Sequence, residues 1–256
     1  MINISINNFF VYFLVFVRMI GILGFNPIFN QRSIPAMART GLAVAVTVLL
    51  APTVPLPEED FSGILYFVAL FKELLIGFIL AHVCMMFYYL LMAMGEILDM
   101  QIGLSMAKVM DPATNIQMGV TDKLLNFLFI TMFFVTNCHL MMFRLIFTSY
   151  EAVPIGVGGI DFSEIGSYGI EIFIDTFAMA LKIAVPIVLA EFLLEIGLGI
   201  LMKLIPAIHI FVINLQMKIS LGIILLFVLA SPISEFIDKY LVNMFNAMRS
   251  SLNHLS

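Results

Sequence analysis

The chain has 256 residues, of which 62% are hydrophobic and only 11% are charged. This composition is far from that of a soluble globular domain and predicts a membrane protein. The formal net charge is −5, and Lys and Arg are not clustered along the chain. A nucleic-acid-binding surface is therefore excluded.

Six apolar runs follow one another along the chain and predict an all-α membrane protein. They cover residues 9–29, 37–54, 64–102, 124–147, 173–202 and 208–231. At 1.5 Å per residue the third run is about 58 Å long and the fifth about 45 Å, against a hydrocarbon core of roughly 30 Å. We therefore expect about six long, partly kinked helices that pack within a hetero-oligomer.

The runs predict one membrane domain over residues 1–256, without separate soluble domains. Its N-terminal helices occupy residues 1–150, and residues 173–231 form a C-terminal helical hairpin whose tip lies near Pro206. Residues 105–123 mix turn-forming and apolar residues, which indicates an irregular loop between long helices. Such a loop could occlude a pore or merely connect two helices. Its candidate gate residues are Met106, Met110, Asp111, Pro112 and Met118.

Charged residues within the apolar runs are the first candidates for function. Each costs roughly 2.5 to 3.5 kcal/mol at the centre of a membrane helix, so lipid cannot surround all of them. We expect a buried polar seam, inside the chain or between subunits. Its candidate members are Arg18, Glu73, Glu96, Asp99, Lys182, Glu191, Glu195, Lys203 and Lys218.

Two pairs within this set leave alternatives open. Glu96 and Asp99 share a helical face, and either belong to the seam or mark a helix end at the membrane surface. Gly95 and Gly103 flank Asp99 and allow another backbone to approach closely. Glu191 and its neighbour one turn on, Glu195, cannot both be comfortably ionised when buried together. They indicate either structural pairing with Lys182 or Lys218, or a proton relay.

No catalytic motif is present: the chain has no G-x-x-x-x-G-K-[ST], no G-x-S-x-G and no H-E-x-x-H. The four histidines are scattered, and Cys84 and Cys138 lie in apolar stretches typical of buried hydrophobic positions. We expect neither an enzyme, nor a metal site, nor a cofactor.

Motifs along nearly the whole chain form a specific combination. The N-terminal part contributes Arg18, residues 27–35 (PIFNQRSIP), Arg39 and residues 49–52 (LLAP). The central part adds residues 73–77 (ELLIG), Gly95, residues 101–103 (QIG), Asp111-Pro112, residues 137–139 (NCH), Ser149-Tyr150 and Pro154. Residues 206–219 (PAIHIFVINLQMKI) are the most specific segment and contain Pro206, Phe211 and Lys218.

This combination resembles the FliR family of flagellar type III export-gate proteins, whose relatives in virulence injectisomes share the pattern. Residues 206–219 are similar to the family's P-x-x-N-x-F-x-x-G-x-P-x-K hairpin. They depart from it at His209, Asn214 and Gln216, where Asn, Gly and Pro are usual. The backbone of the hairpin tip is therefore expected to differ locally from that of the family.

The resemblance implies a subunit in the bacterial cytoplasmic (inner) membrane, at the flagellar basal body. It implies assembly with FliP and FliQ, contact with FlhB-type subunits, and a channel for unfolded export substrates. It also implies that the loop near Asp111 plugs the closed channel. An injectisome subunit is the alternative within the family. A proton-coupled membrane carrier and a membrane scaffold without a pore are the alternatives of other classes.

Overall fold

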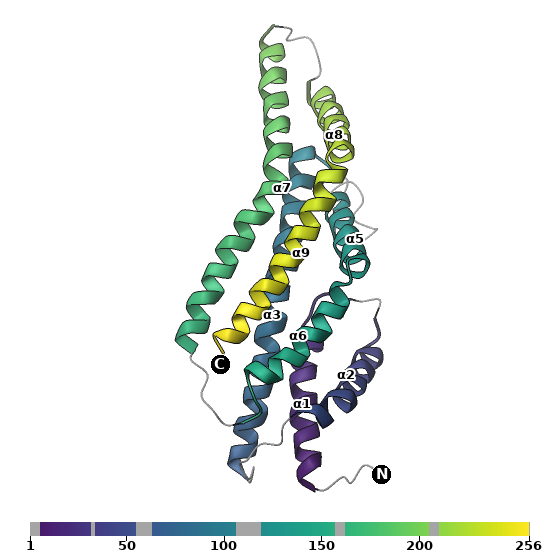
Figure 1. The fold of residues 1–256 in the computed structure, drawn as a ribbon. Helices are drawn as coiled ribbons and strands as arrows, with labels where there is room; N and C mark the ends of the chain where they lie inside the picture. The colour runs from purple at the N-terminus through teal and green to yellow at the C-terminus, as the bar shows by residue number, and fades with distance from the viewer. Residues whose placement is uncertain are drawn as a thin grey trace. The chain divides into compact units, whose positions relative to one another are not determined.

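The computed structural model describes residues 6–31, 34–54, 63–105, 119–156, 162–204 and 210–255. Throughout these residues regular structure is helical, without a strand, so the all-α prediction is confirmed (Figure 1). The helices are α1 (Ile6–Gly24), α2 (Ala36–Leu50), the 3-10 turn η1 (Ala51–Thr53), α3 (Ile64–Ile102), α5 (Val120–Val135), α6 (Cys138–Ala152), α7 (Phe162–Leu204), α8 (Ile210–Val228) and α9 (Ala230–Asn253).

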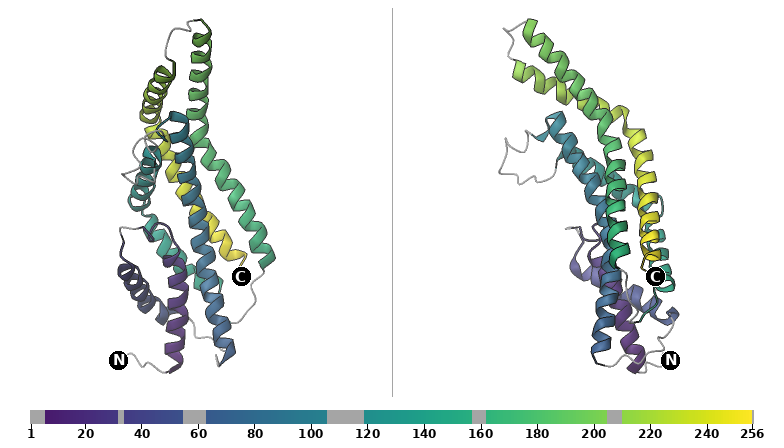
Figure 2. Two further views of the ribbon diagram at one scale, coloured as in Figure 1. Left: turned by 180° about the vertical axis from the view of Figure 1, so that it is seen from behind. Right: turned by 90° about the vertical axis from the view of Figure 1, so that its left-hand side faces the viewer.

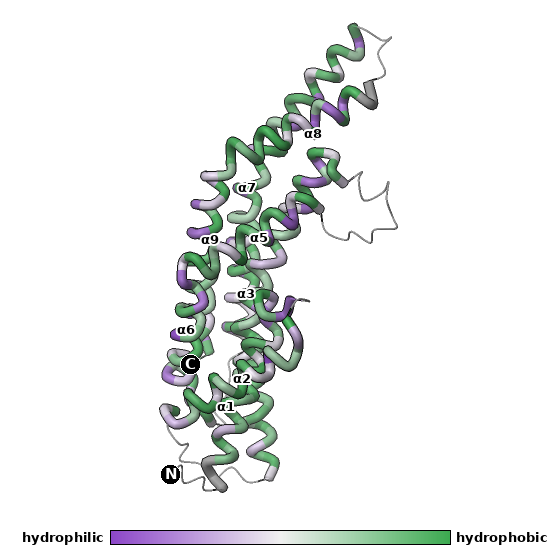
Figure 3. The backbone as a smooth tube through the Cα atoms, turned by 90° about the vertical axis from the view of Figure 1, so that its right-hand side faces the viewer, coloured by the Kyte–Doolittle hydropathy of each residue, from purple (hydrophilic) through white to green (hydrophobic). Residues whose placement is uncertain are grey.

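Three described helical segments are long and apolar enough to cross a membrane, namely Ala36–Thr53, Ile64–Ile102 and Glu164–Leu204. Two consecutive helix pairs, α5 with α6 and α8 with α9, also qualify if each bent pair is one span, which makes up to five. Helix α1 is a shorter apolar helix. Figure 3 shows hydrophobic residues along α3, α7 and α8, whereas hydrophilic residues recur along α9.

Several helix boundaries differ from the sequence prediction: α1 ends at Gly24 rather than at residue 29, and α7 begins at Phe162 rather than at residue 173. The fourth apolar run, 124–147, was expected to be one helix, but it is divided between α5 and α6 by Asn137, which adopts a left-handed φ of 59°. Asparagine tolerates this conformation better than most residues do, and its apolar neighbours conceal the break. The last run was expected to end at residue 231, but α8 ends at Val228 and the polar helix α9 follows.

The chain groups into two compact units, each described by itself. Unit 1 comprises residues 1–88, 137–173 and 242–256, and unit 2 comprises residues 89–136 and 174–241. Helices α3, α7 and α9 contribute residues to both units. The expectation of a single functional domain stays a prediction.

Unit 2 contains the predicted C-terminal hairpin. The C-terminal part of α7 and helix α8 lie side by side and run antiparallel, as both views in Figure 2 show. The ammonium of Lys218 on α8 donates to the carboxylate of Glu195 on α7. Helix α8 also packs closely against the end of α3, where Gly222 leaves room for the side chain of Ile102. A Cβ atom at position 222 would lie only 2.4 Å from a side-chain carbon of Ile102, closer than such atoms can approach.

In unit 1 two glycines allow α1 to contact α3 backbone to backbone. A Cβ built on Gly77 would lie 2.5 Å from the carbonyl oxygen of Arg18 and 2.9 Å from the Cα of Gly21. Backbone atoms cannot give way as a flexible side chain does, so any side chain at position 77 forces the two helices apart.

We therefore expect Gly77→Ala to lower the stability of the chain by about 1–3 kcal/mol, the range for overpacking a close contact. Gly41→Ala is the matched control, because Gly41 lies in α2 with nothing within 4 Å of an added methyl group. That control should gain a few tenths to about 1 kcal/mol from helix propensity. Thermal unfolding in detergent measures both changes, and equal midpoints for the two variants would contradict the close contact.

Candidate functional site

Arg18 on α1 is fully buried in unit 1 and forms an ion pair with the equally buried Glu73 on α3. Its Nε donates to Glu73 Oε2 at 2.5 Å, and its Nη2 donates to Oε1 at 3.0 Å. The pairing is therefore bidentate, the geometry in which a planar guanidinium matches a carboxylate best. Both charges of this pair are satisfied within the chain.

The remaining donors of Arg18 hold the C-terminal end of α6. Nη1 donates to the carbonyl oxygen of Ser149 at 2.8 Å, and Nη2 donates to that of Val153 at 2.9 Å. A cation at the C-terminus of a helix satisfies carbonyls that have no partner within the helix. The guanidinium carbon also lies 4.1 Å from the ring centre of Tyr150, a cation–π distance. One side chain thus joins α1, α3 and α6.

A second buried polar link in unit 1 involves Asn26, which sequence reasoning did not single out. Its Oδ1 accepts from the Ile28 backbone N–H at 2.9 Å and from the thiol of Cys84 at 3.6 Å, and its side-chain amide faces the sulfur of Met142 at 3.8 Å. The signal that could have identified it is an amide side chain at the end of an apolar run, where a buried amide needs partners.

In unit 2, Asp99 is buried beside the N-terminus of α5. Its Oδ1 accepts from the backbone N–H of Thr121 at 2.9 Å, so a carboxylate caps the positive end of that helix. The packing around Asp99 requires glycine at two positions, Gly119 and Gly95. A Cβ on Gly119 would lie 1.5 Å from Asp99 Oδ2, and a Cβ on Gly95 would lie 2.9 Å from the Cα of Asp122.

The other candidates near Asp99 take different positions. Glu96 is exposed on α3, whereas Asp99 is buried. The two carboxylates predicted to share a helical face therefore lie in different surroundings. Gly103 follows the last residue of α3 with a φ of +90°, which a glycine adopts without strain at a helix end. A Cβ at Gly103 would also lie 2.9 Å from a methyl carbon of Leu215 on α8.

The two glutamates of α7 differ in their surroundings. Glu195 pairs with Lys218 across the hairpin. Glu191, one turn earlier, is fully buried, and within the described part of the chain neither of its carboxylate oxygens has a hydrogen-bond partner. A buried polar group without a partner is costly and points to a role other than stability.

The remaining predicted site residues are not joined to these clusters. Lys182 is exposed on α7, and Lys203 is exposed in the last turn of that helix, where a cation suits the helix dipole. Phe211 lies in the first turn of α8, of which the backbone alone is described. Pro206 and the five predicted gate residues, Met106, Met110, Asp111, Pro112 and Met118, lie outside the described residues.

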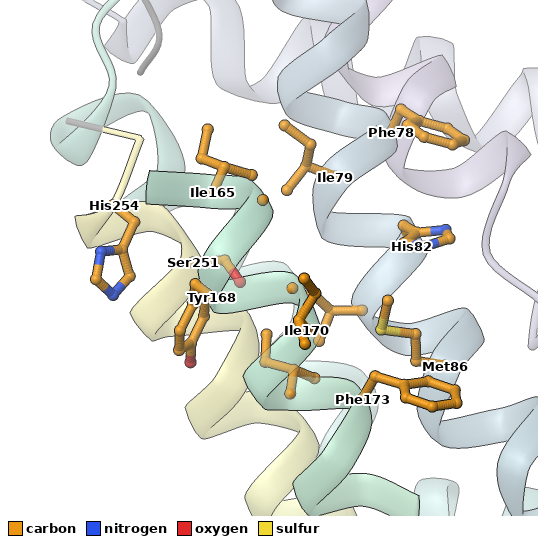
Figure 4. Close-up of a pocket in the computed structure, with 14 residues that line it drawn as sticks. Phe78, Ile79, His82, Met86, Ile165, Tyr168, Ile170, Phe173, Ser251 and His254 are labelled. Atoms are coloured by element: carbon orange, nitrogen blue, oxygen red, sulfur yellow. The ribbon is translucent and has the colours of Figure 1, made fainter. Parts of the chain in front are cut away.

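Unit 1 also contains an apolar cavity of about 540 Å³ that the sequence did not indicate. Figure 4 shows Phe78, His82 and Met86 of α3 on one side and His254, beyond the end of α9, on the other. Residues from the first turns of α7, together with Ser251 of α9, also line the cavity. Among the described residues no group of three His, Cys, Asp or Glu side chains could hold a metal ion. The cavity gave no sequence signal because its lining residues are typical of any membrane helix.

Comparison with known proteins places the chain in a family. The sequence pattern of "Bacterial export proteins, family 1" matches residues 9–244. The chain belongs to this family. The matched region contains every polar side chain of the Arg18, Asp99 and Glu195 clusters, whereas His254 of the cavity lies beyond it.

Several relatives match the chain over most of their own length. The flagellar biosynthetic protein FliR of Escherichia coli (strain K12) is 28% identical over 248 residues, which cover 95% of this chain and 93% of the relative. FliR of Bacillus subtilis (strain 168) is 26% identical over 252 residues, with 98% and 97% covered. The Yop proteins translocation protein T of Yersinia pestis is 25% identical over 210 residues, with 79% and 78% covered.

The Arg18 cluster predicts a large effect of Arg18→Leu. Removing one partner of a buried ion pair leaves the other charge uncompensated, so we expect a loss of about 3–5 kcal/mol. Arg249→Leu on the exposed surface of α9 is the control and should change stability little. The double variant Arg18→Leu/Glu73→Leu should recover part of the loss in thermal unfolding. Failure of the double variant to recover any stability would show that the pair is not the source of the effect.

Replacing Glu191 is expected to change stability in the opposite direction to replacing Arg18, because the carboxylate of Glu191 has no hydrogen-bond partner among the described residues. Glu191→Leu should leave the stability of the isolated chain unchanged or raise it, because no hydrogen bond is lost and a buried polar group is removed. Glu195→Leu should lower stability, because Lys218 loses its partner. Unfolding midpoints of the purified chains in detergent compare the two, and a similar loss for both would mean that Glu191 is satisfied after all.

Proposed function

We propose that the chain is a subunit of the flagellar type III protein export gate. In this proposal it forms the membrane export channel together with FliP- and FliQ-type subunits, contacts an FlhB-type subunit, and passes unfolded flagellar components outward during flagellum assembly. The observation that carries the proposal is the match to relatives named FliR over 93–97% of their length.

The physical chemistry of the described residues supports a subunit of an assembly. An exposed lysine, Lys182, lies in the middle of the apolar helix α7. Lipid cannot satisfy its charge, whereas a neighbouring protein subunit can. A chain that acted alone in a bilayer would leave this cost uncompensated.

The proposed role is that of a non-enzymatic part of the channel wall, with energy for transport supplied elsewhere in the apparatus. The sequence has no nucleotide-binding loop that would couple transport to hydrolysis within this chain. Its helices would be placed in the bacterial cytoplasmic membrane at the flagellar basal body. The whole chain, residues 1–256, would act there as one export-gate domain.

An injectisome export gate is the second candidate function. It is favoured by the similarity to the Yop proteins translocation protein T, which extends over 79% of the chain. The FliR proteins of Escherichia coli and Bacillus subtilis match over a larger share of the chain, 95% and 98%, and the flagellar system is therefore the first choice.

Deletion of the gene in its native host tests the proposal. We expect export of flagellar filament and hook proteins into the medium to fall at least 100-fold and motility to be lost. The wild-type gene and Arg249→Leu should both restore export, whereas Arg18→Leu should restore little. Normal flagellar export with loss of effector secretion would instead identify an injectisome subunit.

The carrier class is tested separately with the purified chain in liposomes. A proton-coupled carrier moves a solute without partner subunits, so solute-driven proton uptake by the isolated chain would contradict the export-gate proposal. The expected result is no such uptake.

A further inference from the structure

One side of α7 within unit 2 is exposed along its length. Asp175, Lys182, Leu189, Leu193, Ile196 and Ile200 fall within about 60° of the helix circumference at 100° per residue, and all six are exposed. We call this set the α7 stripe. The buried residues Thr176, Ala180, Ile183, Ile187 and Glu191 lie on the opposite side of the helix. The stripe is therefore the side of α7 that this chain leaves uncovered.

The two charges of the stripe cannot neutralise each other. Asp175 and Lys182 are seven residues apart, which separates them by about 10.5 Å along the helix axis. Neither forms an ion pair with another residue in the described ranges. Each is thus available to a group outside the chain.

Neither lipid nor water suits this surface as a whole. In lipid the two charges each cost roughly 2.5 to 3.5 kcal/mol near the membrane centre. In water the cost comes from the large apolar side chains of the stripe itself, of which Leu189 is 56% exposed, Leu193 67% and Ile200 60%. A protein surface with apolar contacts and two complementary charges satisfies both kinds of group.

A second copy of the chain does not provide that surface. Copies inserted in one membrane share an orientation, so a two-fold pairing through the stripe would align the α7 helices in parallel. Asp175 would then face Asp175, and Lys182 would face Lys182. Like charges opposite one another are repulsive, and an antiparallel pairing would require copies of opposite topology.

We propose that the α7 stripe docks a membrane helix of a different subunit, which carries a basic side chain level with Asp175 and an acidic side chain level with Lys182. The partner's two charges are about seven residues apart, in the order base then acid if its helix runs parallel to α7 and acid then base if it runs antiparallel. Its apolar side chains then pack against Leu189, Leu193 and Ile196. This inference rests on the proposed function, because it names the partner chemistry of one subunit surface.

The test is site-specific photo-cross-linking in membranes of the native host, followed by mass spectrometry of the adduct. A photoreactive amino acid replaces Leu189 in the stripe, and in a matched control it replaces Ile223 on α8. Both side chains are 56% exposed and belong to unit 2. The expected Leu189 adduct is a peptide of another membrane protein that contains a base and an acid seven residues apart. An adduct with a second copy of the chain, or with lipid alone, would overturn the proposal.

A charge exchange tests the role of complementarity. The variant Asp175→Lys/Lys182→Asp keeps composition and net charge but inverts the order of the charges. The Leu189 adduct should fall at least tenfold, whereas the Ile223 adduct, which reports correct folding, should not change. Asp238→Lys/Lys239→Asp exchanges two exposed charges of α9 and should leave both adducts intact. An unchanged Leu189 adduct in the Asp175/Lys182 exchange would overturn the proposal.

If the exchanged chain fails to accumulate, Lys182→Met provides a second variant that removes only one charge, and a severalfold loss of the Leu189 adduct is expected.

Export of flagellar proteins is measured in the same strains. Normal export after deletion of the gene would overturn the proposed function whatever the adducts. Loss of export on deletion, with Leu189 cross-linked to a second copy, would overturn this inference alone.

Discussion

The need to partner every charge in an apolar setting governs this structure, and Arg18 shows it most clearly. A buried guanidinium is tolerated only when its donors are used, and here they are shared between the carboxylate of Glu73 and two carbonyls at the end of α6. These bonds join three helices that are distant in sequence. The close contact of Gly21 with Gly77 brings α1 near enough to α3 for the pair to form.

Unit 2 meets the same requirement differently. Asp99 and Glu195 find partners in the backbone of α5 and in Lys218, but Glu191 remains buried without a hydrogen bond. The exposed side of α7 carries Asp175 and Lys182 with nothing in the described chain to pair them. The unit is thus incomplete as a membrane protein on its own. The proposed role as one subunit of a larger assembly is consistent with this, because neighbouring chains supply what lipid cannot.

The sequence allowed the helical class, the long third and fifth apolar runs and the C-terminal hairpin to be predicted, since hydrophobic periodicity and length are local properties. It also identified Arg18 and Glu73 as charges that needed partners. It did not show that they pair with each other, because that choice depends on how helices 55 residues apart in sequence pack. The break at Asn137 was missed for a related reason: a single left-handed residue leaves the hydropathy of its neighbours unchanged.

The separation of the Arg18 partners along the chain has a consequence for biosynthesis. Glu73 follows Arg18 by 55 residues, and Ser149 follows it by 131. At translation rates of about 5–20 residues per second, the ribosome needs roughly 3–11 s to reach the first partner and roughly 7–26 s to reach the second. During that interval the nascent α1 carries an arginine that lacks its native partners. Placing it at the membrane centre would cost roughly 2.5 to 3.5 kcal/mol, so a hydrated position is favoured for α1 until α3 is made.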